Sequence, residues 1–307
     1  MYPIQKLIKY AGLGLLCAGA TTLIYNYFRQ NSVNDFFNVT KAELKSVIKF
    51  NEKNFIEIIS SIEPSQISQI QAYGLVQLIK LIDESDLETV LKLIGSIASF
   101  SNNIIILCES GCVDCLVKVF KQLNEGVYNE KIIISLMLCL RTLACNDMSS
   151  EIFMEYIDEF ISCIYMKQGT LSENCLIILG NLTLYSNVCD KMENNISDVI
   201  QWINSNIKSI NGIKAFQILL HLSTNSDKTR LAILQSKGDF QFVITFIWTE
   251  SQISTVRSSL IFLNLMYRNL IADPNEIVPG TLNQFLLSNC GTVKTRVKEL
   301  CFSEDEE

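Results

Sequence analysis

Three cysteines, at positions 108, 112 and 115, form the grouping in the sequence that comes nearest to a metal or redox motif. Cys112-Val113-Asp114-Cys115 has the C-x-x-C spacing, and Cys108 lies four residues before it. A structural zinc site needs four thiolate or imidazole ligands, and neither a second C-x-x-C pair nor a nearby histidine is present. A thioredoxin-like site would need a βαβ context, which this helical stretch lacks. We therefore expect these cysteines to open a helix, with no metal and no cofactor.

The second residue that could do chemistry is His221, the single histidine of the chain. A catalytic histidine needs a nucleophile and an orienting partner, and the spacing indicates neither. The chain has 25 basic and 32 acidic residues, a net charge of −7, whereas nucleic-acid phosphates require a basic face. We predict a non-enzymatic protein with no catalytic residue, no small-molecule substrate and no nucleic-acid partner.

The composition indicates a folded, largely helical chain. Of 307 residues, 49% are hydrophobic, and the sequence has only 13 glycines and 4 prolines. This excludes a disordered, collagen-like or disulfide-knot protein, and so few prolines permit long helices. Ten cysteines follow position 30, and most occupy apolar helical patterns where free cysteine acts as a small hydrophobe. That usage favours a reducing compartment, so we expect the body of the protein to face the cytosol.

The first 34 residues differ from the rest, because they contain Lys6, Lys9 and Arg29 and no acid. The run from Tyr10 to Phe28 is uncharged and apolar, and as a helix it would reach about 28 Å, close to one hydrocarbon core. We predict a signal-anchor transmembrane helix in residues 1–30 and a short linker in 31–40. The residues expected to contact lipid are Tyr10, Leu13, Leu15, Leu16, Leu23, Ile24, Tyr25 and Phe28.

Two other interpretations of this leader stay open. It also fits a cleaved signal peptide, with Lys6 and Lys9 before a short apolar Tyr10–Leu16 and Ala18-Gly19-Ala20 as the cleavage site. Alternatively, it is the first helix of the folded body, buried in the core.

The remainder of the chain is periodic. Five segments share an apolar pair, a polar or small residue, an apolar anchor and mostly polar or small residues: 93–99, 139–145, 178–184, 218–224 and 261–267. The anchors stand at 97, 143, 182, 222 and 265, which gives spacings of 46, 39, 40 and 43 residues. This is the period of armadillo and HEAT repeats.

The stretches between the anchors predict three helices per repeat, the armadillo pattern. A polar break of Asn, Asp and Ser, suited to helix capping, precedes a short helix such as Ile104–Cys108 or Arg230–Leu234. Gly111 or Gly238 then permits a turn, and a further helix follows, Val113–Phe120 or Phe240–Trp248. One repeat cannot bury its own apolar face, so the repeats must stack. We assign residues 41–84 to a helical cap, 85–302 to the repeats and 303–307 to an acidic tail.

One column of polar residues precedes the anchors: Ser96, Thr142, Asn181, His221 and Asn264. Polar side chains aligned from repeat to repeat are expected to line the inner face of the stack, where they would bond an extended partner peptide. The competing interpretation is that each one bonds a neighbouring helix or turn.

Asn181-Leu182-Thr183 and Asn264-Leu265 resemble the asparagine-bearing helix of armadillo repeats. Importin-type repeats carry tryptophan four residues before that asparagine. The corresponding positions here hold Lys92, Leu138, Ile177, Gln217 and Leu260, so the resemblance does not extend to nuclear-signal recognition.

The order of an apolar leader followed by repeats resembles the mitochondrially anchored armadillo proteins, namely the X-linked armadillo repeat-containing family and its autosomal relative. The glycine- and alanine-rich stretch 11–20, ending at Ile24-Tyr25, is similar to their opening. Ser99-Phe100-Ser101-Asn102 and Leu220-His221-Leu222-Ser223 resemble their repeat cores. The chain departs from that family in having only Arg29 after the span and a short linker.

Taken together, these patterns predict an all-α, armadillo-like α-solenoid (a right-handed superhelix) preceded by one N-terminal transmembrane helix. The resemblance implies a scaffold or adaptor on the mitochondrial outer membrane, with a cytosolic body and protein partners such as motor adaptors, acting in mitochondrial distribution or dynamics. The alternatives are insertion in the ER membrane, or a soluble or ER-associated armadillo scaffold with a cleaved leader.

Overall fold

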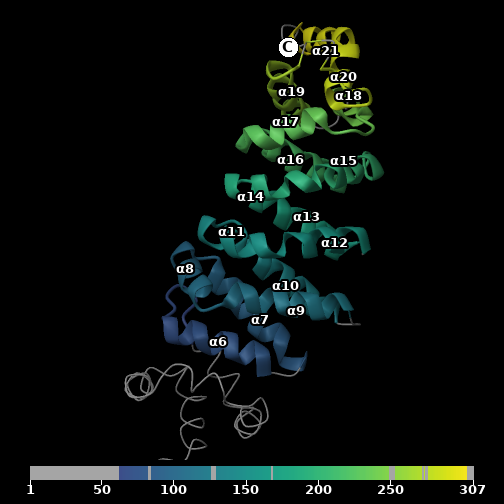
Figure 1. The fold of residues 1–307 in the computed structure, drawn as a ribbon. Coiled ribbons are helices and arrows are strands. Elements are labelled where there is room, and N and C mark those ends of the chain that lie inside the picture. The colour runs from purple at the N-terminus through teal and green to yellow at the C-terminus, as the bar shows by residue number, and fades with distance from the viewer. Residues whose placement is uncertain are drawn as a thin grey trace, which may run out of the picture. The chain divides into compact units, whose positions relative to one another are not determined.

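The computed structural model of the chain describes residues 62–81, 84–125, 129–166, 169–248, 253–271, 273 and 276–302 (Figure 1). The predicted anchor, linker and acidic tail, and residues 41–61 of the predicted cap, lie outside these ranges. Within them every regular element is a helix, and the only β-type pairing is an isolated antiparallel bridge between Lys237 and Thr281. The prediction of an all-α chain is therefore confirmed for the described residues.

The chain divides into two compact units after Tyr156, and each is described by itself. The first contains α6 (Gln69–Leu81), α7 (Glu84–Ala98), α8 (Ser101–Glu109), α9 (Cys112–Glu125), α10 (Glu130–Leu143), α11 (Asp147–Phe153) and the 3₁₀ helix η2 (Met154–Tyr156). The second contains α12 (Ile157–Met166), α13 (Thr170–Leu182), α14 (Ser186–Lys191), η3 (Met192–Asn195), α15 (Ile196–Ser205), α16 (Ile210–Asn225), α17 (Asp227–Gln235), α18 (Gln241–Trp248), α19 (Ile253–Arg268), α20 (Leu282–Ser288) and α21 (Cys290–Phe302).

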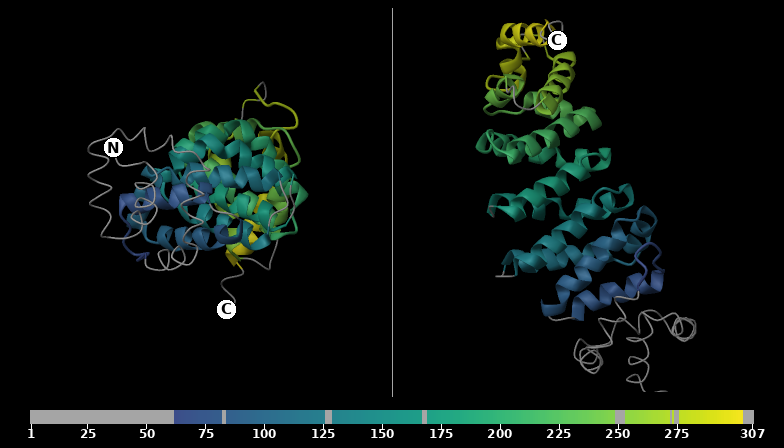
Figure 2. Two further views of the ribbon diagram at one scale, coloured as in Figure 1. Left: turned by 90° about the horizontal axis from the view of Figure 1, so that it is seen from below. Right: turned by 180° about the vertical axis from the view of Figure 1, so that it is seen from behind.

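The helices recur with the predicted period. We call α7, α10, α13, α16 and α19 the long helices; they begin at 84, 130, 170, 210 and 253, at intervals of 46, 40, 40 and 43 residues. Each of the first four is followed by a short helix (α8, α11, α14 or α17) and then by a further helix (α9, α12, α15 or α18). In the first unit α7 packs on α10, and in the second α16 packs on both α13 and α19 (Figure 2).

The core consists of the apolar faces of these helices. The five repeat anchors are examples: Ile97, Leu143, Leu182 and Leu222 are fully buried, and Leu265 is partly buried. Most of the free cysteines described are buried among them, as the apolar patterns predict. Cys145 is the exposed exception.

The predicted turn glycines and caps are confirmed in part. Gly111 has a φ of 76°, but Gly238 does not adopt positive φ; Gly169 and Gly280 do, at 80° and 77°. The amide of Gly238 instead donates to the Gly280 carbonyl at 3.3 Å, which holds the extended loop before α18.

Asn146 caps α11 by accepting from the amide of Met148 at 3.0 Å, and Ser226 caps α17 by accepting from that of Thr229 at 3.2 Å. The expectation of polar caps is wrong for α8 and α14, which begin after Phe100 and Tyr185 without a side-chain cap.

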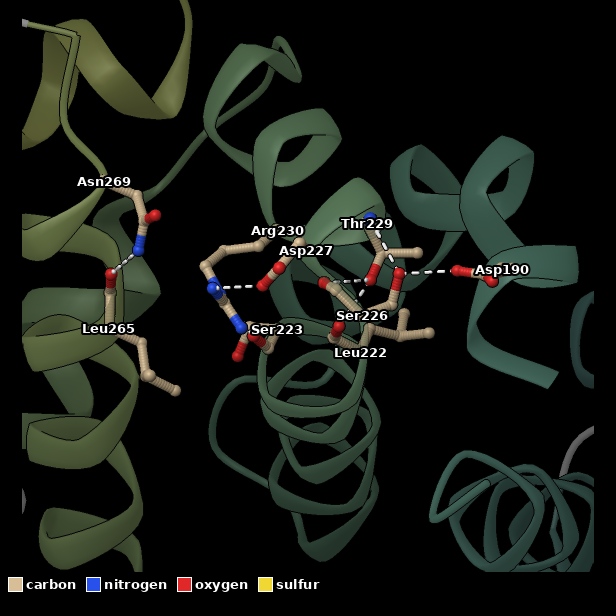
Figure 3. Close-up of polar contacts among 9 residues, drawn as sticks. All are labelled: Asp190, Leu222, Ser223, Ser226, Asp227, Thr229, Arg230, Leu265 and Asn269. Carbon is tan, nitrogen blue, oxygen red and sulfur yellow. Dashed lines mark hydrogen bonds and ion pairs between the residues drawn. The ribbon is translucent and has the colours of Figure 1, made fainter. Parts of the chain in front are cut away.

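A buried polar side chain joins each of the first four long helices to the short helix that follows. The carbonyls at a helix C-terminus have no partner within the helix, so a sharp turn buried there would leave them unsatisfied. In the repeats they accept from side chains six or seven residues later: Asn103 to Ile97 (3.2 Å), Ser149 to Leu143, Cys189 to Thr183 (3.1 Å) and Thr229 to Leu222. All four donor residues are buried. Figure 3 shows the Thr229 junction.

Replacing Thr229 with Val should lower the free energy of unfolding by about 1–3 kcal/mol, because the isosteric side chain leaves the Leu222 carbonyl buried and unsatisfied. Thr224→Val is the matched control: Thr224 is exposed and bonds only the Leu220 carbonyl of its own helix, so we expect a change below about 0.5 kcal/mol. Urea titrations of both variants measure the difference. Equal effects would contradict a structural role for the junction.

Candidate functional site: the exposed face of the long helices

All five residues of the polar column lie near the C-terminal ends of the long helices. Ser96 and Thr142 belong to α7 and α10, which pack together in the first unit. Asn181, His221 and Asn264 belong to α13, α16 and α19, which pack in succession in the second. The column is therefore brought onto neighbouring helices within each unit, as the repeat frame requires.

Ser96 and Thr142 use their hydroxyl hydrogens inside their own helices. The Ser96 Oγ donates to the Lys92 carbonyl at 3.0 Å, and the Thr142 Oγ1 donates to that of Leu138 at 2.9 Å. Such bonds to the carbonyl four residues earlier are a common local arrangement for these residue types. Their oxygens keep lone pairs, so toward a partner peptide both residues can act as acceptors of amide hydrogens.

His221 connects two long helices. Its Nδ1 lies 3.1 Å from the Gly180 carbonyl of α13 and 3.3 Å from the Oγ1 of Thr183, the residue that follows α13. Burial lowers the pKa of His221, and the hydrogen bond to the Gly180 carbonyl opposes that shift without cancelling it. The imidazole therefore has a structural contact within the second unit, and one edge of the ring is committed to it.

The two asparagines of the column differ in their surroundings. Asn264 is exposed, and its side chain has no hydrogen-bond partner in the described part of the chain. Asn181 is partly buried on α13. Asn264 thus offers a free amide, with both donor and acceptor atoms, to a second molecule.

Exposed aliphatic side chains on the same helices are the feature that the sequence reasoning missed. Ile134 and Leu138 are exposed on α10, Ile210 on α16, and Ile253 and Ile261 on α19. Leu138 stands at the position where importin-type repeats carry tryptophan. The signal in the sequence was the helical spacing of these residues from the column. In α16, for example, Lys214, Gln217 and His221 follow Ile210 by four, seven and eleven residues, which places all four on one side of the helix. Apolar side chains alternating with amides suit an extended peptide, which needs pockets for side chains and partners for its backbone.

Two ion pairs neutralise charged side chains on the long helices. Lys92 and Glu88 form an ion pair at 2.6 Å within α7, and Lys214 of α16 pairs with Glu173 of α13 at 2.5 Å. Pairs that are this exposed contribute little to stability. Their main effect is to neutralise the one lysine of α7 and the one lysine of α16.

The three cysteines that resemble a metal motif are structural. Cys112 and Cys115 lie buried in α9, Cys115 contacts the Val76 carbonyl at 3.7 Å, and burial raises the pKa of Cys108 to about 11. A thiol with a raised pKa is a poor nucleophile and a poor metal ligand. In the ranges that the structure describes, no group of three or more His, Cys, Asp or Glu side chains could hold a metal ion.

The predicted membrane-contacting residues, Tyr10 to Phe28, lie outside the described residues. Across the ranges that are described, no single helix is long and apolar enough to cross a membrane, although the bent pair Glu130–Leu143 with Asp147–Tyr165 meets the length and composition test.

Solved structures show which fold these repeats build. A designed armadillo repeat protein in complex with the peptide (KR)4 aligns with a TM-score of 0.53 and 15% identity, over 75% of this chain and 95% of that one. A second designed armadillo repeat protein aligns with a TM-score of 0.54 and 14% identity, over 75% of this chain and 96% of that one.

A chain from a structure of a phosphorylation switch that controls the interaction between cadherin and beta-catenin aligns with a TM-score of 0.51 and 15% identity, over 87% of this chain and 57% of that one. No protein-family model and no curated protein sequence matches the chain. The chain therefore has an armadillo-type α-solenoid fold, as predicted.

His221 makes the stability of the protein dependent on pH. Because its pKa is lower in the folded than in the unfolded state, the unfolded state binds more protons below about pH 6.5, and stability must fall as the pH drops through that range. We expect His221→Asn, which installs the residue found at this position in α13 and α19, to flatten the decline. Urea titrations between pH 7.5 and 5.0 test this, and an unchanged slope in the variant would contradict it.

Proposed function

We propose that this chain is a non-enzymatic scaffold that binds an extended segment of another protein on the exposed faces of its long helices. The observation that carries the proposal is Asn264, a free amide in the polar column, flanked on α19 by exposed Ile261 and Ile253. Aliphatic side chains exposed beside an unpartnered amide do not stabilise the fold. The aliphatic side chains can supply apolar contacts to a peptide, and the Asn264 amide can form hydrogen bonds with its backbone.

The fold supports this use of the surface. In a solenoid each repeat contacts its neighbours, so the buried faces maintain the fold while one exposed face forms a continuous binding surface. One of the structural neighbours is a designed armadillo repeat protein in complex with a peptide. The proposal extends peptide binding to this chain on the basis of its own exposed residues.

A panel of random 16-residue peptides, displayed on phage and selected on the full-length chain in detergent, tests the proposal. We expect selected peptides to lose about thirtyfold in affinity when Asn181 and Asn264 are both replaced by Ala, since each hydrogen bond is worth about 1 kcal/mol. The melting temperature of the single variant Asn264→Ala should change by less than about 4 °C, because the Asn264 side chain has no hydrogen-bond partner in the described part of the chain.

Gln201→Ala on α15 is the matched control, because Gln201 is exposed but belongs to a different class of helix. Its affinity for the selected peptides should equal that of the unaltered chain. Failure to select any peptide, or equal losses in affinity and stability for the asparagine variants, would contradict the proposal.

We further propose that residues 1–30 hold the scaffold at the mitochondrial outer membrane with its body in the cytosol, acting in mitochondrial distribution or dynamics through motor-adaptor partners. This rests on the apolar run 10–28, the basic flanks and the family resemblance. Confinement to a surface would raise the effective concentration of the binding face for partners on the same membrane.

Deleting residues 1–30 should release the protein to the cytosol, because the apolar run supplies the membrane affinity. Fractionation and imaging of tagged chains against mitochondrial and ER markers measure the outcome. Continued sedimentation of the deleted chain with mitochondria would contradict the anchor, and ER staining of the full chain would contradict the location. Amino-terminal sequencing of the mature protein distinguishes an anchor from a cleaved leader.

A further inference from the structure

We propose that the partner segment contacting α19 is acidic, and that Arg257 and Arg268 select it. This inference rests on the proposed function and names the chemistry of the partner at one end of the binding face. The evidence is a stripe on α19 formed by Ile253, Arg257, Ile261, Asn264 and Arg268, which we call the α19 stripe.

The spacing of the stripe places its members on one side of the helix. Successive members are four, four, three and four residues apart, and at 100° per residue all five fall within about 80° of one another. Each of them is exposed, and Ile253 is the most exposed large apolar residue of the described chain at 84%. Five exposed side chains on one face of a core-packed helix form a continuous surface strip.

The charge of the stripe is unbalanced. Neither arginine has an ion-pair partner among the residues that the structure describes. Helix α19 contains no acidic residue, and neither does α16, beside which it packs. By contrast, the lysine of α16 on this face, Lys214, is already paired with Glu173. Free positive charge on these three long helices is therefore confined to α19.

The positive charge of the stripe is opposite in sign to the net charge of most of the chain. Residues 35–252 contain 17 basic and 25 acidic residues, a net charge of −8, whereas residues 253–302 contain 5 and 3, a net charge of +2. On a protein that is acidic elsewhere, the unpaired arginines make this the location where basic segments are repelled and acidic segments are attracted. Charge complementarity thus identifies an acidic occupant, and arginine in particular pairs with carboxylates in a two-pronged geometry.

The dimensions of the stripe define a sequence pattern for the partner. At 1.5 Å per residue, Arg257, Ile261 and Arg268 lie about 6, 12 and 22 Å from Ile253 along the helix. An extended chain advances about 3.3 Å per residue, so matching contacts fall about two, four and seven residues after the first. The expected pattern is apolar-x-acid-x-apolar-x-x-acid for a segment that runs along α19. In that register the Asn264 amide faces the partner backbone between the second apolar residue and the second acid.

The probe is a fluorescein-labelled ten-residue peptide of serine with isoleucine at its second and sixth positions and aspartate at its fourth and ninth. Fluorescence anisotropy with the full-length chain in detergent should show saturable binding. Arg257→Glu with Arg268→Glu should weaken it at least about tenfold, because two exposed attractions become two repulsions. Arg257→Lys with Arg268→Lys should retain most of the affinity, and raising the salt from 50 to 500 mM should weaken binding to the unaltered chain.

Two controls separate charge from unfolding and from general electrostatics. Lys237→Glu reverses one charge at an exposed residue on the loop before α18, matches the single reversal Arg257→Glu, and should leave binding unchanged. A probe with lysine in place of both aspartates should not bind. The melting temperatures of all variants should stay close to that of the unaltered chain, since exposed unpaired arginines add little stability.

Each remaining outcome decides against the inference. Undiminished binding to the double reversal, or no binding of the acidic probe at millimolar concentration, overturns it. A gain of more than about threefold on deleting residues 303–307 assigns the stripe to the chain's own acidic tail instead of a partner. If the random panel yields peptides that require Asn264 but show no acidic bias, this inference fails and the proposed function stands. If no peptide depends on the long helices, both fail.

Discussion

The structure depends on one constraint, which is that the carbonyl groups at the end of each long helix must find donors although the chain turns sharply and stays buried. An unsatisfied buried carbonyl costs about 1–3 kcal/mol, and the described repeats contain several such ends. A polar side chain from the following short helix supplies the donor at Ile97, Leu143, Thr183 and Leu222. After α19 the same need is met from the turn, where the Asn269 amide donates to the Leu265 carbonyl at 2.8 Å (Figure 3).

This constraint fixes the direction in which each repeat proceeds. Because the donor residue is buried, the short helix must dock at the end of the long helix and cannot extend it. At the Thr229 junction further bonds fix the geometry: the Arg230 Nε donates to the Ser223 carbonyl at 2.7 Å, and the Ser226 Oγ donates to Asp190 at 2.6 Å. The Asp190 contact comes from the preceding short helix, α14, so successive junctions are tied to one another within the second unit.

A consequence is that the polar column is not uniformly available to a ligand. His221 bonds the end of α13, Ser96 and Thr142 bond their own helices, and Asn181 also has an interaction within the chain, so four of the five predicted residues have structural contacts. Asn264 has none in the described chain. The most available surface therefore lies on α19, whose C-terminal end is satisfied by Asn269 and which carries the most exposed aliphatic side chain, Ile253.

The long helices, their period and their anchors could be predicted from sequence because apolar side chains repeat with the helical period and are costly to expose. The junction donors could not, because asparagine, serine, cysteine and threonine fill the same role. No single residue type recurs at the four junctions, and from the sequence Cys189 is indistinguishable from an apolar core residue of its helix. The polar breaks do not cap α8 and α14: Phe100 and Tyr185 precede these helices, and the polar donor lies two or three residues inside them.

Which basic residues of the long helices are paired with an acid could not be predicted from the sequence either, for a different reason. Whether an arginine is free depends on what faces it from another helix, and Lys214 and Arg257 occupy the same position relative to the column in consecutive long helices. Glu173 lies within reach of Lys214 from α13 and neutralises it. Arg257 has no acidic residue on α16 or α19 to do the same. Since neither residue is needed to bury the core, the fold sets no requirement on these charges. What distinguishes Arg257 from Lys214 is therefore that its charge remains unpaired in the described chain.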